Sequence, residues 1–452
     1  MRRMVLKAVA AGLLGWAAGT ASAQATQSPP GAGGEAAETL FRNVRVFDGT
    51  SPQLSAPTDV LVRGNRIAGI GGDLRPAAGA TVIDGRGGTL MPGLIDVHVH
   101  LTFGALTQAQ MASPELTPAR AGAAAAGEAG RMLMRGFTAV RDVGGPIFEL
   151  KQQIDAGAVP GPRIWPSGPT ISQTAGHGDY RHPSEGPRRW TGKASRAELL
   201  GAGYIADGRD EVLAATREAL RFGASQIKVM AGGGTSSAYD PIDVTQYTLD
   251  EMKAAVEAAE DWGTYVTVHA YTPRSVRRAI EAGVKCIEHG QLLDEATLRL
   301  MAERGIWLST QNLVADTEAM DPQRREKRRP VIEGQERLWP TAKRLGVKLA
   351  WGTDFLFEPE LNAQQNAYLL RLKQWFSPAE ILKMVTHDNA ELLALSGLRS
   401  PYQGRLGVVA PGALADLILV AGDPLRDIDL IGDPERNFTI IMKDGRLVKD
   451  AR

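Results

Sequence analysis

Six polar side chains at the ends of short apolar segments are the residues of this sequence best suited to chemistry. They are His98, His100, Lys228, His269, His289 and Asp354. His98 and His100 alternate with valines as V-H-V-H, and alternation along a strand turns both imidazoles to the same face. Imidazole nitrogens and carboxylate oxygens are the ligands that zinc uses where no thiolate is present. The set therefore predicts a site for divalent metal ions.

Lys228 does not fit such a site as an ammonium ion. An ammonium group has no lone pair to donate, and placing it beside a divalent ion costs several kcal/mol in repulsion and desolvation. Addition of carbon dioxide to the neutral amine would produce a carbamate, an anionic oxygen ligand that can bridge two ions. A snorkelling lysine, or a helix cap in the case of Asp354, explains either residue alone. The whole set favours two divalent ions, zinc being the expected metal, with N6-carboxylysine at position 228.

The segments that carry these residues alternate with helical stretches, which is typical of repeated βα units. The candidate strands are LIDVHVH, FTAVRD, RIWPSGPTI, QIKVMAG, YVTVHAY, KCIEHG, IWLSTQN and KLAWGTD. Eight parallel strands over about 300 residues predict an α/β fold, a (β/α)8 TIM-like barrel with its active site at the C-terminal strand ends. Short strands and turn residues before and after this region predict a small β-sandwich built from both chain ends.

The sequence divides into four predicted segments. Residues 1–23 combine three basic residues, a short apolar run and Ala-Ser-Ala, which is the architecture of a signal peptide. They predict export to the periplasm or out of the cell, by the general or the twin-arginine route. The other segments are a flexible lead-in at 24–36, a β-sandwich at 37–90 plus 403–452, and a metallohydrolase barrel at 91–402. The apolar run is shorter than the roughly 20 residues of a membrane-spanning helix, so no stable membrane insertion is expected.

Composition narrows the classes of partner. The chain has 51 basic and 51 acidic residues, and a nucleic-acid binder needs a basic excess or patch. The one candidate patch, RREKRR at 324–329, is interpreted as a solvated helix face. Lone Cys286 has no partner for an intramolecular disulfide and is interpreted as a packing residue in an apolar strand. A small-molecule substrate is expected, and so is assembly into a homo-oligomer.

The strand-end residues together resemble a known family. V-H-V-H after LMPGLID, the fourth-strand lysine, the single histidines of strands five and six and the G-T-D aspartate are similar to the binuclear amidohydrolase superfamily. The resemblance covers nearly all of the chain after the leader. It implies a more buried ion bound by His98, His100 and Asp354, an outer ion bound by His269 and His289, and carboxylated Lys228 bridging the two. It also implies that a hydroxide between the ions attacks the substrate carbonyl, with Asp354 as general base and then general acid.

Three further motifs narrow the resemblance. ISQTAGHGDYR at 171–181, KVMAGGGTSS at 228–237 and VHAYT at 268–272 resemble the branch of Xaa-Pro dipeptidases, related carboxypeptidases and ochratoxinase-like amidases. This implies hydrolysis of an amide or peptide bond to a C-terminal amino acid, in a dipeptide or an N-acyl amino acid. His177 and Tyr271 would then hydrogen-bond the free carboxylate of that residue, and Arg181 is a further candidate partner.

Other functions stay open at this point. A lactonase or esterase could use the same two metals. A mononuclear deaminase typically needs no lysine on the fourth strand, so Lys228 argues against it. A metal-free scaffold protein of the same fold would have lost ligands, and no ligand position is lost here. A serine hydrolase finds no support because the sequence contains no G-x-S-x-G.

Overall fold

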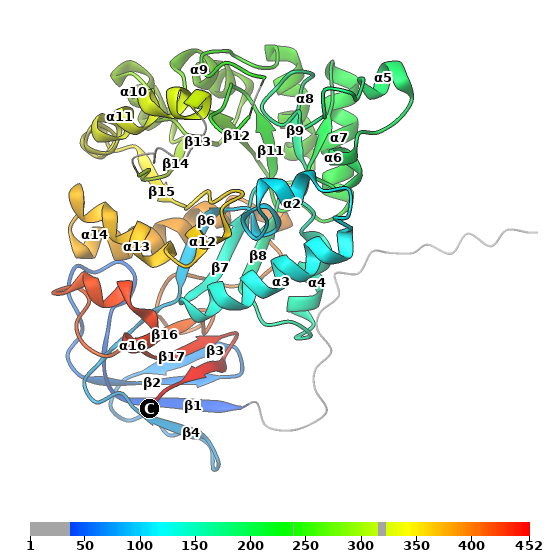
Figure 1. Cartoon of the computed structure of the whole chain (residues 1–452). Helices are drawn as coiled ribbons and strands as arrows, with labels where there is room; N and C mark the ends of the chain where they lie inside the picture. The colour runs from blue at the N-terminus through cyan, green and yellow to red at the C-terminus, as the bar shows by residue number, and fades with distance from the viewer. Residues whose placement is uncertain (1–36, 238, 315–321) are drawn as a thin grey trace, which may run out of the picture. The chain divides into compact units, whose positions relative to one another are not determined.

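The computed structural model describes residues 37–237, 239–314 and 322–452 (Figure 1). The described residues belong to one compact unit, Ala37–Arg452. The predicted signal peptide and lead-in, residues 1–36, lie outside the described residues. Within the described ranges, no helix is both long enough and apolar enough to cross a membrane.

Ten short parallel strands form the centre of this unit. They are β6 (Leu94–Val99), β7 (Phe137–Asp142), β8 (Arg163–Pro166), β9 (Thr170–Ser172), β10 (Gly203–Ile205), β11 (Ile227–Met230), β12 (Val266–Ala270), β13 (Cys286–His289), β14 (Trp307–Thr310) and β15 (Lys348–Trp351). Strands β6 to β8 form one parallel sheet, and the others form a second in the order β10-β9-β11-β12-β13-β14-β15. Backbone N–H groups of Asp354 and Ser225 donate across the two edges, to His98 O (2.8 Å) and Pro166 O (2.7 Å). The predicted α/β fold of TIM-barrel type is thus confirmed.

The strands differ from the predicted eight in one region. The predicted strand RIWPSGPTI is two strands, β8 and β9, and β10 is an additional strand that pairs with β9. Gly168 between β8 and β9 has a φ of +73°, a left-handed conformation that interrupts an extended chain. Pro169 follows it and has no N–H to donate to a neighbouring strand. The Gly-Pro pair is therefore the physical reason for the break.

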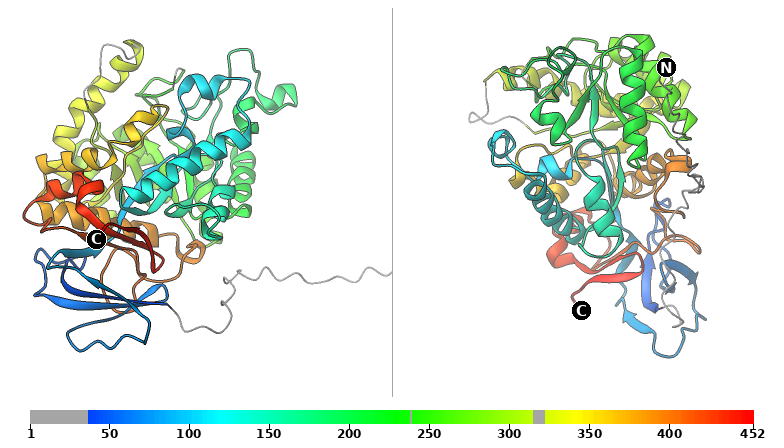
Figure 2. Two further views of the ribbon diagram at one scale, coloured as in Figure 1. Left: turned by 60° about the horizontal axis from the view of Figure 1, so that its bottom comes forward. Right: turned by 90° about the vertical axis from the view of Figure 1, so that its right-hand side faces the viewer.

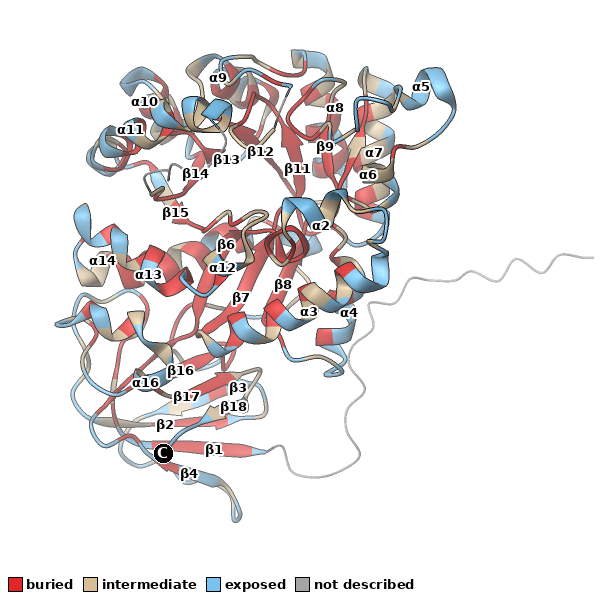
Figure 3. Cartoon of the chain, in the orientation of Figure 1, coloured by how far each residue is buried: buried red, intermediate tan, exposed pale blue. Residues whose placement is uncertain are grey.

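Helices cover the outside of the strands, as Figure 2 shows from two further directions. The longer ones are α3 (Pro118–Met134), α4 (Phe148–Asp155), α7 (Arg209–Arg221), α8 (Leu249–Asp261), α9 (Pro273–Ala282), α10 (Glu295–Arg304) and α11 (Pro322–Leu345). The shorter ones are α1 (Leu101–Gly104), α2 (Gln108–Ala112), α5 (Arg188–Thr191), α6 (Arg196–Leu199), α12 (Pro359–Asn362), α13 (Gln365–Leu370), α14 (Pro378–Lys383), α15 (Asn389–Ala394) and α16 (Pro434–Asn437). The central strands are buried and the outer helix faces are exposed (Figure 3), so the amphipathic helices close the core.

Strands from both ends of the described chain share a separate sheet. They are β1 (Glu38–Val46), β2 (Thr58–Arg63), β3 (Arg66–Ile70), β4 (Thr81–Asp84), β5 (Thr89–Pro92), β16 (Leu417–Val420), β17 (Phe438–Lys443) and β18 (Arg446–Asp450). β5 joins the two ends, because it pairs with β1 on one side and β16 on the other. A two-layer sandwich with the boundaries 37–90 and 403–452 stays a prediction.

The barrel and this sheet share a core and an ion pair. Phe438 of β17 and Phe137 of β7 belong to the same buried apolar cluster. Arg163 of β8 donates from Nε to Asp416 (2.7 Å) and from Nη2 to Asp444 (2.6 Å). Because Arg163 and Asp416 are both buried, loss of either partner would leave a buried charge without its counter-ion. These contacts hold the N-terminal ends of the barrel strands and leave the opposite ends open for a site.

Candidate active site

All six predicted metal-site residues line one cavity of about 190 Å³ at the C-terminal ends of the barrel strands. The C-terminal ends of parallel strands meet at the same mouth, so residues far apart in sequence converge there. The residues come from five strands: His98 from β6 and His100 just after it, Lys228 from β11, His269 from β12, His289 from β13 and Asp354 from the turn after β15.

Three of these residues form a group that could hold a metal ion. Oδ1 of Asp354 lies 3.2 Å from Nε2 of His98 and 3.3 Å from Nε2 of His100. The three ligand atoms lie within 4.8 Å of one another. Nε2 of His98 is buried and has no hydrogen-bond partner of acceptable geometry among the described residues. A buried nitrogen left unsatisfied in this way fits a bound cation.

Hydrogen bonds turn the imidazoles in the required direction. Nδ1 of His100 donates to Gly144 O (3.0 Å), which leaves its Nε2 lone pair facing Asp354. Nε2 of His269 donates to Gly233 O (3.1 Å), so Nδ1 is its available ligand atom. The rings of His269 and His289 are neighbours, with centroids 4.3 Å apart. Because each ring nitrogen not facing the cavity has a fixed partner, the free lone pairs are directed inward.

Burial and neighbouring charges together shift the pKa values of these groups. It lowers the pKa of His289 to about 3, because the desolvated site disfavours the imidazolium ion. Burial also lowers the pKa of the Lys228 amine. Burial alone would raise the pKa of Asp354, but the imidazoles around it, His98 first, lower that pKa well below its usual value. The arrangement therefore favours a neutral imidazole at His289 and an ionised carboxylate at Asp354, the forms that metal binding needs, and it shifts Lys228 toward the neutral amine that carboxylation needs.

Unusual backbone conformations place His289 and Asp354. Both residues have positive φ, 78° and 54°, in the left-handed region that non-glycine residues adopt at a cost of about 1 kcal/mol or more. Gly352 precedes the Asp354 turn, and a Cβ at this position would collide with the backbone nitrogen and Cβ of His98. The strand ends of β15 and β6 can approach closely only because residue 352 is glycine. This approach brings the Asp354 carboxylate to the His98 imidazole.

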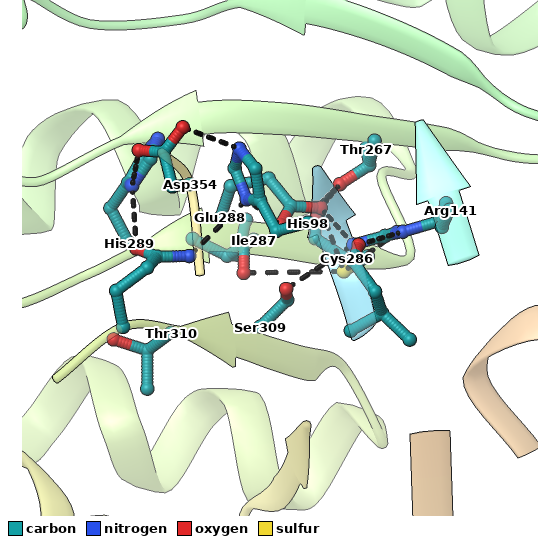
Figure 4. A network of polar contacts seen from close by, with 12 residues as sticks. His98, Arg141, Thr267, Cys286, Ile287, Glu288, His289, Ser309, Thr310 and Asp354 are labelled. Carbon is teal, nitrogen blue, oxygen red and sulfur yellow. Dashed lines mark hydrogen bonds and ion pairs between the residues drawn. The ribbon is translucent and has the colours of Figure 1, made fainter. Parts of the chain in front are cut away.

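A buried charged network lies beneath the His98 ring (Figure 4). Nδ1 of His98 donates to Oε2 of Glu288 (2.8 Å), and Nη2 of Arg141 donates to Oε1 of the same carboxylate (2.6 Å). The Thr267 hydroxyl also donates to Glu288. Arg141 and Glu288 are both fully buried. Sequence reasoning missed this pair, although a glutamate inside the apolar run C-I-E-H was a signal that it had a buried partner.

Two of the three predicted substrate residues lie beside the histidines. The His177 ring stacks on His269 with centroids 3.9 Å apart, and its Nδ1 is 2.8 Å from Ser237 Oγ. Tyr271 packs edge-on against His269 at 5.1 Å and stacks with His289 at 5.0 Å. Both residues line the cavity. Their positions suit contact with a substrate bound at the histidines.

Arg181 lies in a different place. Its side chain lines a neighbouring groove with Tyr180 and His182, and its Nε donates to Asp179 at 2.7 Å. The Arg181 guanidinium group is therefore already paired with the Asp179 carboxylate. Its role as a carboxylate partner stays a prediction without support from this geometry.

The basic run at 324–329 is not simply a solvated helix face, so that interpretation was wrong. Arg324 and Arg328 of α11 line the same cavity as the histidines. Lys327 donates to the carbonyl oxygens of Ser237 (2.8 Å) and Asp240 (2.7 Å). Helical spacing explains this, because residues 324, 327 and 328 lie on the inner face of the helix. The signal in the sequence was that periodicity, which a count of charges does not detect.

Comparison with known proteins agrees with the fold. Residues 89–448 match the amidohydrolase family. Ochratoxinase from Aspergillus niger is 32% identical over 385 residues, which are 80% of this chain and 75% of that protein. Two solved structures each match this chain over 91% of its length and over 100% of their own length. A prolidase complexed with N-methylphosphonate-L-proline has 34% identity and a TM-score of 0.83, and a Xaa-Pro dipeptidase with bound methionine has 30% and 0.78.

A parallel barrel with histidines, a lysine and an aspartate at its C-terminal mouth defines the class of the protein. The chain belongs to the amidohydrolase family. It is a hydrolase that acts on C–N bonds, and its homologues lie in the ochratoxinase and prolidase branch.

Proposed function

We propose that the protein is a binuclear metal-dependent hydrolase that cleaves the amide bond to a C-terminal amino acid, in a dipeptide or an N-acyl amino acid. The observation that carries the proposal is the convergence of His98, His100 and Asp354 in one cavity with the other predicted ligands. The similarity to a prolidase, a Xaa-Pro dipeptidase and an ochratoxinase supports the choice of an amide substrate.

In this proposal the residues divide between two ions as the sequence pattern implies. His98, His100 and Asp354 would hold one ion and His269 and His289 the other, and Lys228, carboxylated to a carbamate, would supply an anionic oxygen ligand to both. The low exposure of Lys228, 2%, and the lowered pKa of its amine support carboxylation, since carbon dioxide adds only to the neutral amine. Zinc is the proposed metal because all the donors are imidazole nitrogen or anionic oxygen.

Divalent ions bound here would supply a nucleophilic water at neutral pH and polarise the substrate carbonyl. The chain's own contribution to the reaction is proton transfer by Asp354. As the water oxygen bonds to the carbonyl carbon, Asp354 takes a proton from it. Asp354 then gives a proton to the amide nitrogen while the C–N bond breaks, because an amine anion is too poor a leaving group. The products are a carboxylate and a free amine.

His177 and Tyr271 position the substrate in this proposal. Both lie against the His269 ring, so a carboxylate bonded to them lies next to the outer-ion ligands. Ser237 and Asp240 hold the Nδ1 side of His177, at 2.8 and 3.3 Å, which leaves Nε2 for a ligand. The aromatic and imidazole rings here also exclude water from the reacting bond.

A substrate screen tests the proposal. Purified protein loaded with zinc is assayed against Xaa-Pro dipeptides and N-acyl amino acids, and its metal content is measured by elemental analysis. We expect about two metal ions per chain and release of a free amino acid from at least one member. Cleavage of lactones or esters without cleavage of any amide would contradict the amide proposal.

Asp354→Asn tests the proton transfer. Asparagine keeps one oxygen ligand but cannot exchange a proton, so we expect metal to be retained and kcat to fall by roughly 10²- to 10⁴-fold. Asp450→Asn, at the exposed C-terminal end of β18, is the matched control and should retain wild-type kcat. Full activity of Asp354→Asn would overturn the assigned role.

Two further expectations complete the proposal. Export directed by residues 1–23 would place the enzyme in the periplasm or outside the cell. Assembly into a homo-oligomer is tested by light scattering of the purified protein.

A further inference from the structure

A buried carboxylate that takes no part in the proposed proton transfer lies next to the predicted metal ligands. Asp96 of β6 is 0% exposed, and it contacts Gln365 of α13, which is 1% exposed. Gln365 is not among the described residues that line the cavity. We propose that Gln365, acting through Asp96, is a positioning residue that sets the separation between His98 and Asp354. This inference rests on the metal site of the proposed function.

Both oxygens of Asp96 accept hydrogen bonds from the segments that carry the ligands. Oδ1 accepts from the backbone N–H of His98 (3.1 Å) and from that of Thr353 (3.1 Å). Oδ2 accepts from the Thr353 hydroxyl (2.7 Å). A backbone hydrogen bond from the N–H of Asp354 to His98 O (2.8 Å) crosses between the same two segments. Because Thr353 directly precedes Asp354, one carboxylate ties the backbone of one ligand to the backbone beside another.

Side chains, rather than a regular ladder of backbone hydrogen bonds, join β6 to β15. In the described strands, β6 is at the edge of one parallel sheet and β15 is at the edge of the other. Asn389 bridges them three residues before the ligands, since its Nδ2 donates to Ile95 O (2.7 Å) and Trp351 O (2.9 Å). Asp96 bridges them at the level of the ligands. Its carboxylate therefore fixes the distance between the two segments where the metal site begins.

Gln365 holds the Asp96 carboxylate from the opposite side. Its Nε2 donates to Oδ2 of Asp96 (2.9 Å), and its Oε1 accepts from Nε of Arg135 (3.1 Å). This orientation of the amide places a donor on the carboxylate and an acceptor on the guanidinium, so both ends of the amide are satisfied. Arg135 is in turn paired with Glu128, a buried residue of α3. A connected network of this kind restricts Asp96 to one orientation.

The turn that carries Asp354 depends on such support. Asp354 has a φ of +54°, and a non-glycine residue keeps this conformation only where its surroundings impose it. The two hydrogen bonds from Thr353 to Asp96 impose it from the preceding residue. If Asp96 turned away, the Asp354 carboxylate could move from the His98 ring, whose Nε2 lies 3.2 Å from its Oδ1. Bonds from zinc to such donors are about 2.0–2.2 Å long, so a shift of a few tenths of an ångström would weaken ion binding.

Two substitutions of similar shape on α13 separate positioning from stability. Gln365→Met keeps the length of the side chain but removes its donor to Asp96 and its acceptor for Arg135. Asn366→Leu is the matched control, because Asn366 is also buried and its Nδ2 donates to two backbone carbonyl oxygens of other segments, 3.1 and 3.0 Å away. On the other side of Asp96, Thr353→Val removes the hydroxyl donor and Thr353→Ser retains it.

The measured quantity is zinc affinity, from competition with a chelator at neutral pH, together with thermal unfolding of the metal-free proteins. We expect Gln365→Met and Thr353→Val to bind zinc at least roughly 10-fold more weakly than wild type, the usual cost of losing an outer partner of a metal site. Thr353→Ser should stay within about threefold of wild type, because its hydroxyl still donates. Asn366→Leu should unfold at a lower temperature but keep its zinc affinity within about twofold.

Zinc affinity distinguishes a positioning role from a purely structural one. If Gln365→Met lost thermal stability but kept wild-type zinc affinity, or if Asn366→Leu lost as much affinity as Gln365→Met, the inference would be overturned. Equal zinc affinities of Thr353→Val and wild type would also overturn it. A wild type that binds zinc, with the expected losses in the variants, but cleaves no amide would contradict the proposed amide hydrolysis alone. A wild type that binds no zinc would overturn both proposals.

Discussion

Glu288 allows a sharp test of how the barrel supports its candidate metal site. Its carboxylate accepts hydrogen bonds from Arg141, His98 and Thr267, and the side chains of Glu288 and Arg141 have no exposed surface. Glu288→Gln keeps the shape of the side chain but removes the charge. The Arg141 guanidinium would then be buried without its counter-ion, which costs about 3–5 kcal/mol. This is a large part of the roughly 5–15 kcal/mol that stabilises a typical folded domain.

The assay is urea unfolding at neutral pH, followed by circular dichroism, for three proteins. Glu288→Gln should unfold at a clearly lower urea concentration than wild type. The double variant Arg141→Met, Glu288→Gln removes both charges and should recover part of the loss, because no unpaired buried charge remains. A loss below about 1 kcal/mol in the single variant, or a double variant less stable than it, would refute the reasoning.

The same network predicts a pH dependence. Burial alone would raise the pKa of Glu288, but Arg141 and His98 lower it well below its usual value. A carboxylate whose pKa is lower in the folded state stabilises the fold above its unfolded pKa, and this contribution is lost as pH falls toward the folded pKa. Wild type should therefore lose stability steadily below about pH 4.5, and Glu288→Gln should lose less over that range. If the free energy of unfolding fell equally with pH in wild type and Glu288→Gln, this account would be contradicted.

Metal content adds a second measurement on the same variant. Glu288 fixes the orientation of the His98 ring, and loss of such a partner typically weakens metal binding about 10- to 100-fold. Competition with a chelator should show this weakening in Glu288→Gln.

Three other substitutions or treatments test separate features. Lys228→Ala should bind less metal than wild type and lose nearly all activity, because the bridging carbamate cannot form, and full metal content in this variant would contradict the bridge. Gly234→Ala should lower kcat/KM by at least about tenfold with little change in thermal stability, since an added Cβ would overlap the His177 imidazole; unchanged kcat/KM would mean that His177 does not position substrate. Iodoacetamide should modify Cys286 only after unfolding, because the thiol is buried and its pKa is raised to about 12; rapid modification of the folded protein would contradict that burial.

Much of the fold could be predicted from local pattern. Alternation placed His98 and His100 on one face, and strands separated by helical stretches predicted a parallel barrel. RIWPSGPTI was misinterpreted as one strand because its apolar residues suggested continuity. The backbone turn at Gly168 divides it into two, and β10 was missed since three residues give little periodic signal.

The sequence by itself determined the fold class and the kinds of side chain at the strand ends, because both follow from local spacing and from the rule that parallel strand ends converge. Only the tertiary structure decided which charges meet. It placed Arg181 on Asp179, Arg328 at the cavity and Glu288 between Arg141 and His98. The physical reason is that charge pairing depends on contacts of a few ångströms, which for Glu288, Arg141 and His98 arise only when distant strands pack, and for Arg181 and Asp179 depend on the conformation of the loop that carries them.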